Sequence, residues 1–165
     1  VLLAPDAAPM SPADEAPPVR NGADYNFLAV THGYSLEFEE GSWGARGHYS
    51  LPIDMPLAVS GGIDYFPEDD ASSMTVFGAD LSCAWPMDIL GSGDAFLGAG
   101  PRLYRSTSSN GSSSSSSTEF SFGAVLGATY PVGPVSVYGD FGVDRVYGNT
   151  ALFTRFGIAY EFGGF

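Results

Sequence analysis

The side chains that could do acid–base chemistry recur at alternate positions along the chain. Arg46, His48 and Arg155 share this spacing with five carboxylates, Asp64, Asp80, Asp140, Asp144 and Glu161. Carboxylates next to an imidazole or a guanidinium can move protons, so a catalytic cluster is one interpretation. The other is an internal network of ion pairs, because charges buried in a protein must be paired.

The second interpretation is favoured. His32 and His48 are the only imidazoles, and no serine–histidine–aspartate order stands out among the many serines. We therefore expect a structural protein rather than an enzyme.

Two other segments could bind ions or carry modifications. Glu68, Asp69 and Asp70 offer the hard oxygen ligands that calcium prefers. They lack an alternating ligand spacing, which favours a solvated acidic loop, and we expect no metal and no cofactor. Asn110 and Ser112 belong to a glycosylation sequon in a serine-rich segment, so glycans are possible there. A plain flexible loop is the alternative.

The charge balance excludes one class of partner. Nineteen Asp and Glu residues oppose six basic residues, all arginine, which gives a net charge of -13. Nucleic acid is excluded because phosphate binding needs clustered Lys and Arg. The acidic coat and a first residue of Val1 rather than Met favour an exported protein that has lost a leader. Cys83 is alone, so an intramolecular disulfide and a cysteine zinc site are excluded.

Eight runs of alternating apolar and small or polar residues must position these side chains. They span Tyr25–Phe38, Ser42–Leu51, Leu57–Phe66, Met74–Trp85, Ser92–Tyr104, Glu119–Tyr130, Val135–Arg145 and Ala151–Phe162. Short Pro-centred turns alternate with longer polar connections, as in an up-and-down meander. Because an even number of strands can close without a free edge, we predict an all-β fold, an eight-stranded antiparallel up-and-down β-barrel.

Two segments fall outside this alternation. Residues 1–23 are rich in Pro, Ala and acid, which predicts an extended N-terminal tail that reaches about 70 Å at roughly 3.1 Å per residue. Residues 24–165 would form the barrel domain. Within it, the serine-rich segment 106–118 can bury nothing and is predicted to be a loop.

The two faces of the predicted strands differ in polarity. One carries rings and branched chains with almost no charge, and the other carries the Arg, His and Asp residues among many glycines. An eight-stranded barrel has an interior barely wide enough for its own side chains. Small and polar residues fit inside, whereas the rings and branched chains of the first face would overfill it, so the apolar face is predicted to point outward, as lipid requires. Five aromatic residues near strand ends would form interfacial girdles: Trp43, Tyr65, Trp85, Tyr104 and Tyr130.

The meander, the inverted polarity and the ending Gly157-Ile158-Ala159-Tyr160-Glu161-Phe162 with a closing Phe165 resemble the small outer-membrane β-barrels of Gram-negative bacteria. The resemblance covers about Asp24 to Phe165. It implies that the final strand, with its terminal aromatic, is the signal that the barrel-insertion machinery reads.

Two functional hypotheses follow. In the first, the tail, led by Val1, Leu2, Leu3, Ala4 and Pro5, docks on a neighbouring barrel and builds a filament-like homo-oligomer at the cell surface or outside the cell. A row of small residues on the fifth strand suits such close protein contact: Gly91, Gly93, Ala95, Leu97, Ala99, Pro101 and Leu103. In the second, a monomeric barrel lies in the lipid bilayer of the outer membrane as a scaffold, adhesin or narrow pore.

Overall fold

The computed structural model describes residues 25–67, 72–87, 93–109, 113–146 and 148–162, and these form strands joined by turns. The strands are β1 (Asn26–Ser35), β2 (Glu40–Ser50), β3 (Leu57–Pro67), β4 (Ser72–Met87), β5 (Gly93–Ser109), β6 (Ser114–Val132), β7 (Val135–Val146) and β8 (Asn149–Phe162). Within these residues, no helix is long and apolar enough to cross a membrane. The predicted tail, residues 1–23, lies outside the described residues.

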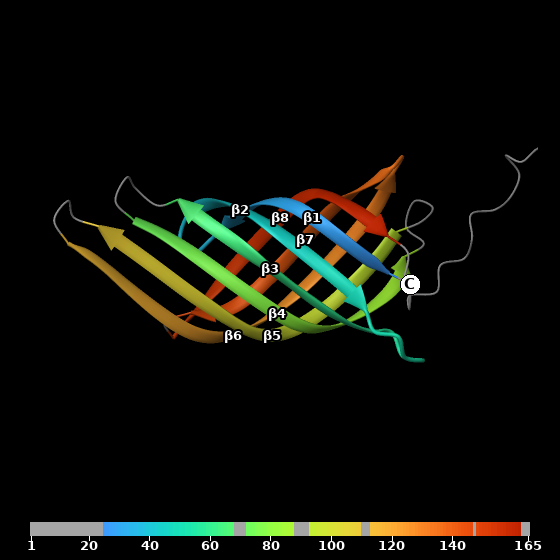
Figure 1. Ribbon diagram of the computed structural model, residues 1–165, viewed down its shortest axis with the longest axis horizontal. Coiled ribbons are helices and arrows are strands. Elements are labelled where there is room, and N and C mark those ends of the chain that lie inside the picture. The colour runs from blue at the N-terminus through green and yellow to red at the C-terminus, as the bar shows by residue number, and fades with distance from the viewer. Residues whose placement is uncertain (1–24, 68–71, 88–92, 110–112, 147, 163–165) are drawn as a thin grey trace, which may run out of the picture.

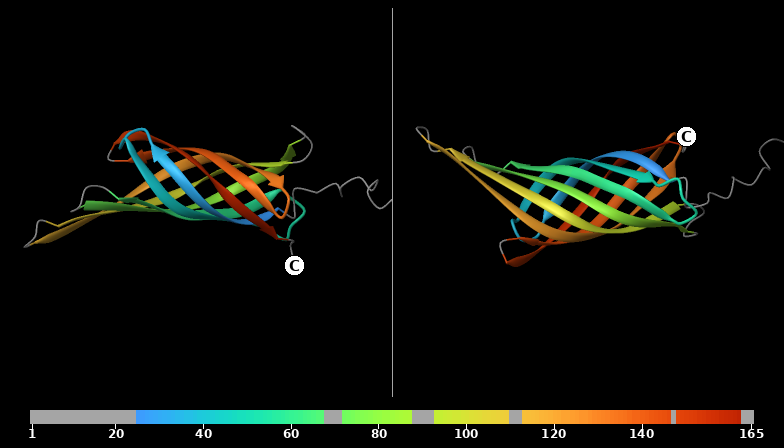
Figure 2. Two further views of the ribbon diagram at one scale, coloured as in Figure 1. Left: turned by 90° about the horizontal axis from the view of Figure 1, so that it is seen from above. Right: turned by 60° about the horizontal axis from the view of Figure 1, so that its bottom comes forward.

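The eight strands close into one antiparallel barrel in chain order, and β8 pairs with β1 (Figure 1). This confirms the predicted fold. We call the end where β1 begins and β8 ends the terminal end, and the end where β1, β3, β5 and β7 finish the loop end. The strands lie well off the long axis of the molecule (Figure 2).

The register fixes that inclination. A path along paired residues that leaves β6 at Phe120 crosses all the other strands and returns to β6 at Tyr130, ten residues further along the strand. With strands about 4.8 Å apart and a rise of about 3.3 Å per residue, this stagger gives a tilt of about 40°. Each residue therefore advances about 2.5 Å along the barrel axis.

The serine-rich segment differs from its prediction as a loop. β5 continues to Ser109 and β6 starts at Ser114, so most of residues 106–118 form an antiparallel ladder in which Ser108 pairs with Ser115. This β5–β6 hairpin extends past the other strands at the loop end (Figure 2). A run of serines shows no alternation of apolar and polar residues, which is the pattern that identifies a strand from sequence. The backbone ladder of the barrel nevertheless continues into this segment.

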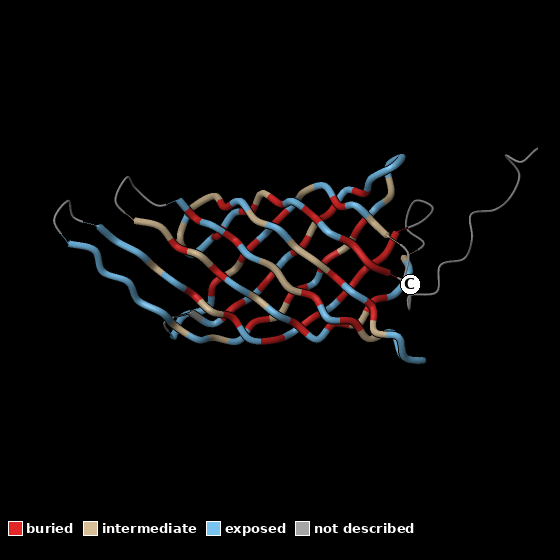
Figure 3. The backbone as a smooth tube through the Cα atoms, in the orientation of Figure 1, coloured by how far each residue is buried: buried red, intermediate tan, exposed pale blue. Residues whose placement is uncertain are grey.

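Buried and exposed residues alternate along the strands (Figure 3), and the exterior carries the apolar residues as predicted. Exposed large apolar side chains come from all eight strands. Their Tyr and Trp members gather at two levels along the axis. The loop-end ring comprises Tyr34, Trp43 and Tyr65, and the terminal-end ring comprises Tyr49, Trp85, Tyr130 and Tyr160. From the register and tilt, the two rings lie about 20 Å apart along the axis.

The interior holds more aromatic residues than predicted. Near the terminal end, the rings of Phe27, Phe96 and Tyr138 pack together, with Phe27 and Phe96 centroids 5.8 Å apart. A second cluster near the loop end contains Phe66 and Phe153, with centroids 6.0 Å apart. The interior was expected to hold small and polar residues, and these rings fit there as well because neighbouring glycines leave room for them.

Gly127 shows how this room arises. A Cβ atom at this position would lie 2.3 Å from the ring of Phe96, so only glycine lets the ring pack against the backbone of β6. The two aromatic clusters lie on either side of the polar middle of the barrel, which is the candidate site.

Candidate functional site

Strand alternation brings arginine and aspartate side chains from six strands into the middle of the barrel. Because successive side chains on a strand point to opposite faces, each of these residues shares the inward face of its strand with small residues. The network comprises Arg46 on β2, Asp64 on β3, Asp80 on β4, Arg102 and Tyr104 on β5, Asp140 and Asp144 on β7, and Arg155 on β8.

Arg155 joins two strands that are distant in the chain. Its Nε donates to Asp64 Oδ2 at 3.0 Å and its Nη1 to Asp140 Oδ1 at 2.9 Å. Arg46 also bonds Asp64, and the hydroxyl of Tyr138 donates to Asp140. Each carboxylate that Arg155 binds therefore has a second donor.

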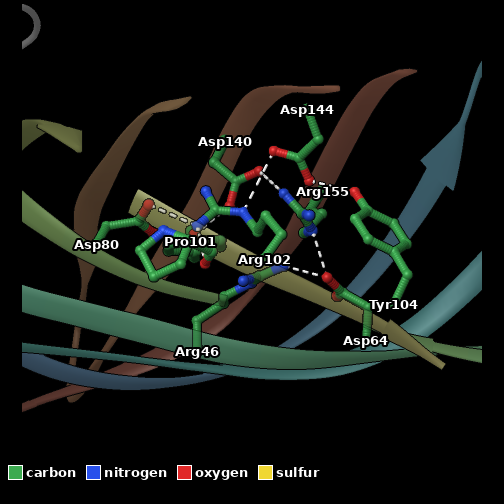
Figure 4. Close-up of polar contacts among 10 residues, drawn as sticks. Arg46, Asp64, Asp80, Pro101, Arg102, Tyr104, Asp140, Asp144 and Arg155 are labelled. Atoms are coloured by element: carbon green, nitrogen blue, oxygen red, sulfur yellow. Dashed lines mark hydrogen bonds and ion pairs between the residues drawn. The ribbon is translucent and has the colours of Figure 1, made fainter. Parts of the chain in front are cut away.

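Arg102 makes a corresponding link between β4 and β7 (Figure 4). Its Nη1 donates to Asp80 Oδ1 at 2.7 Å and its Nε to Asp144 Oδ1 at 3.2 Å. The hydroxyl of Tyr104 donates to Asp144 Oδ2 at 2.6 Å. Asp80 depends on Arg102 alone for its ion pair among the described residues.

These groups are close to fully withdrawn from water. The arginine and aspartate side chains of the network are at most 10% exposed. Gly123 allows the packing, since a Cβ atom there would lie 1.6 Å from Asp144 Oδ1. Three guanidinium groups facing four carboxylates leave a net charge of about -1, so the network is nearly neutral, as burial requires.

Six of the eight residues predicted for the interior network belong to it, and the other two lie inside the barrel but apart from it. His48 stacks on Phe27 in the terminal-end cluster with centroids 5.4 Å apart, and neither of its ring nitrogens has a hydrogen-bond partner among the described residues. Glu161 accepts hydrogen bonds from Thr129, at 3.0 Å, and from Ser136.

Sequence reasoning missed Arg102 and misplaced Tyr104. Tyr104 was predicted to belong to an exterior girdle, but it is 0% exposed and bonds Asp144 inside the barrel. The signal was present in the alternation of β5, because a strand that points Pro101 and Leu103 outward must point Arg102 and Tyr104 inward.

Little open space remains beside the network. A cavity beside the network, lined by Arg46, Asp80 and Asp140 among others, has a volume of about 10 Å³, which is about the space that one water molecule needs. Among the described residues, no three His, Cys, Asp or Glu side chains are placed to hold a metal ion. The candidate ligands Glu68 to Asp70, the sequon at Asn110 and Ser112, and the leading residues Val1 to Pro5 lie outside the described residues.

No protein-family model matches the chain, and no curated protein matches it by sequence. Solved structures do match. The N-terminal β-barrel domain of Pseudomonas aeruginosa OprF superimposes with a TM-score of 0.61 at 11% identity, over 84% of this chain and 97% of that one. Neisserial surface protein A gives a TM-score of 0.59 at 17% identity, over 86% and 98%. Ail of Yersinia pestis, crystallised with a heparin analogue, gives 0.55 at 11%, over 84% and 97%.

The chain has the fold of the small eight-stranded outer-membrane β-barrels. This outer-membrane barrel fold bears out the resemblance that the strand pattern and inverted polarity indicated. Identities of 11% to 17% also show that the outer-membrane barrel fold tolerates a nearly complete change of sequence.

Proposed function

We propose that this chain is a barrel embedded in the outer membrane, that its interior is plugged by ion pairs, and that it serves as a rigid non-enzymatic anchor for its loop end at the cell surface. The observation that carries the proposal is the exterior. Apolar side chains cover all eight strands between two rings of Tyr and Trp.

Lipid explains that distribution better than a neighbouring protein does. A contact with one neighbour needs an apolar patch on one side, whereas a bilayer must be met on every side. The separation of the rings, about 20 Å, is close to the height of about 25 Å that is typical of the apolar band of such barrels. Aromatic side chains at both edges of the band suit the membrane–water interfaces.

The interior supports an anchor rather than a pore. The network of Arg46, Arg102 and Arg155 with its aspartates spans the lumen, and aromatic clusters occupy both sides of it. What distinguishes the loop end is the long β5–β6 hairpin, so we propose that this hairpin is the part displayed to partners outside the cell. Tail-mediated assembly into filaments stays a prediction, because it depends on residues 1–23.

Quenching of tryptophan fluorescence tests the proposal. Trp43 and Trp85 are exposed and belong to opposite rings, so single-tryptophan variants Trp43→Phe and Trp85→Phe report the two levels separately. In vesicles of brominated phosphatidylcholine, we expect both tryptophans to be quenched, more strongly by bromines near the headgroup than by bromines near the chain end. Unquenched tryptophans in a protein that stays dispersed without detergent would refute membrane embedding and favour the filament.

A further inference from the structure

The described arginines of this acidic chain lie in two places, the interior of the barrel and its outer surface. Three of the six, Arg46, Arg102 and Arg155, lie in the interior network, and Arg20 precedes the described residues. The remaining two, Arg105 and Arg145, are exposed and lie on the outward rows of β5 and β7. On a protein with a net charge of -13, these two are the exterior guanidinium groups within the described ranges.

The two arginines lie on either side of the outward row of β6. Arg105 pairs with Thr118, which is two residues before Phe120 on that row. Arg145 lies one residue beyond the last pair of the β6–β7 ladder, Gly123 with Asp144, and is therefore in register with Phe122. Phe120 is 79% exposed and Phe122 is 63% exposed. The patch formed by Arg105, Phe120, Phe122 and Arg145 is the rim patch.

The position of the rim patch along the barrel axis follows from the register and the strand tilt. From the register and tilt, the α-carbons of Arg105 and Arg145 lie within about 2 Å of the level of Phe120, roughly 6 Å beyond the loop-end ring of Tyr34, Trp43 and Tyr65. If that ring marks the edge of the hydrocarbon, the guanidinium groups lie among the headgroups. Neither makes an ion pair or a side-chain hydrogen bond with another described residue.

We propose that the rim patch binds phosphate groups of anionic lipids in the leaflet at the loop end. Phe122, which is level with the loop-end ring, reaches the acyl chains, and Phe120 packs against the lipid between the two arginines. This inference rests on the proposed membrane embedding. Charge complementarity carries it, because a guanidinium matches a phosphate with two parallel hydrogen bonds. The exposed rings favour a lipid over a free anion, which has no apolar part to contact them.

Lipid selectivity measures this binding. The full chain is placed in nanodiscs of phosphatidylcholine with a minor fraction of phosphatidylglycerol, and the lipids retained after mild extraction are counted by native mass spectrometry. We expect the wild type to be enriched in phosphatidylglycerol. Arg105→Gln and Arg145→Gln should each reduce the enrichment about fivefold, and the double variant about 25-fold, from the effect of one basic residue near a membrane surface. Arg105→Lys with Arg145→Lys should keep most of it.

Leu36→Asp is the matched control. Leu36 is exposed in the β1–β2 turn at the same end of the barrel, and this change alters the net charge as much as either single glutamine variant. We expect it to leave the enrichment unchanged. An equal loss in Leu36→Asp would mean that net charge rather than the rim patch selects the lipid, which overturns the inference.

Two further outcomes would also overturn it. Wild-type enrichment in the double glutamine variant would show that the arginines bind no headgroup. Complete displacement of phosphatidylglycerol by inorganic phosphate would show a site for a free anion instead of a lipid. If brominated lipids quench the tryptophans of the wild type but the protein retains no excess of phosphatidylglycerol, the rim patch alone is refuted. If brominated lipids do not quench the tryptophans, the proposed function itself is refuted.

Discussion

Replacing Arg102 with methionine tests whether the ion-pair network holds the barrel together. The change removes the only ion-pair partner that Asp80 has among the described residues and leaves Asp144 with the hydroxyl of Tyr104 alone. Breaking a buried ion pair by removing one partner costs about 3–5 kcal/mol, because a charge stays buried without compensation. We expect Arg102→Met to lie near the upper end of this range.

Arg155→Met provides the comparison. It also removes two ion pairs, but Asp64 keeps Arg46 and Asp140 keeps Tyr138. The loss should therefore lie near about 3 kcal/mol, the lower end of the range. Asp140 and Asp144 each keep a tyrosine hydroxyl, so the difference between the two variants isolates the value of Arg46, the second donor that Asp64 has and Asp80 lacks among the described residues.

The measurement is unfolding by urea of the protein inserted in phospholipid vesicles, followed by the emission of Trp43 and Trp85, which face outward. With a slope of about 2–3 kcal/mol per M, the loss of about 5 kcal/mol in Arg102→Met should lower the midpoint by about 1.7–2.5 M urea. Adding Asp80→Asn and Asp144→Asn should restore most of it, because no charge is then left unpaired. A midpoint for Arg102→Met equal to that of the wild type, or no recovery in the triple variant, would refute the reasoning.

Three other results are expected. Gly127→Ala should lower the free energy of unfolding by about 1–3 kcal/mol, because the new methyl group would overpack against the ring of Phe96. Gly139→Ala should be nearly neutral in the same urea assay, since the nearest atom to its new Cβ outside the adjoining residues would be 3.9 Å away. Equal losses in the two variants would contradict the packing argument. Thr107→Cys with Ser116→Cys should form a disulfide on oxidation, because the two residues are paired across the β5–β6 hairpin, and failure to crosslink would argue for a loop. In planar bilayers the plugged barrel should carry no steady ionic current, and a stable conductance would contradict the filled interior.

The sequence was sufficient to predict the barrel, its strand number and the direction of its apolar face. Alternation of polarity with a period of two carries all three, and it is strong on strands such as β8, where Phe156, Ile158 and Tyr160 are exposed and Arg155 is buried. The interior residues Asp64, Asp80, Asp140 and Asp144 follow from the same alternation.

Alternation of polarity could not predict three features: the hairpin of the serine-rich segment, the inward position of Tyr104 and the pairing of Arg155 with Asp64. In the serine-rich segment both faces are polar, so the period disappears although the ladder of Ser108 with Ser115 continues. Tyr104 was misplaced because a position near a strand end indicates a girdle only if the side chain points outward. The pairing of Arg155 with Asp64 depends on the stagger of the closed barrel, which no local pattern reveals.

That last pair also has a consequence for folding. Arg155 and Asp64 are separated by 91 positions in the chain, and the ladder between β1 and β8 closes the circle in which they meet. The interior charges cannot all be neutralised until the last strand is in place, so a sheet that has not yet closed keeps water around its aspartates. We therefore expect the pairing of β8 with β1 to be strongly cooperative. Only the correct register of β8 brings Arg155 to its aspartate partners, so ion pairing favours that register over the others.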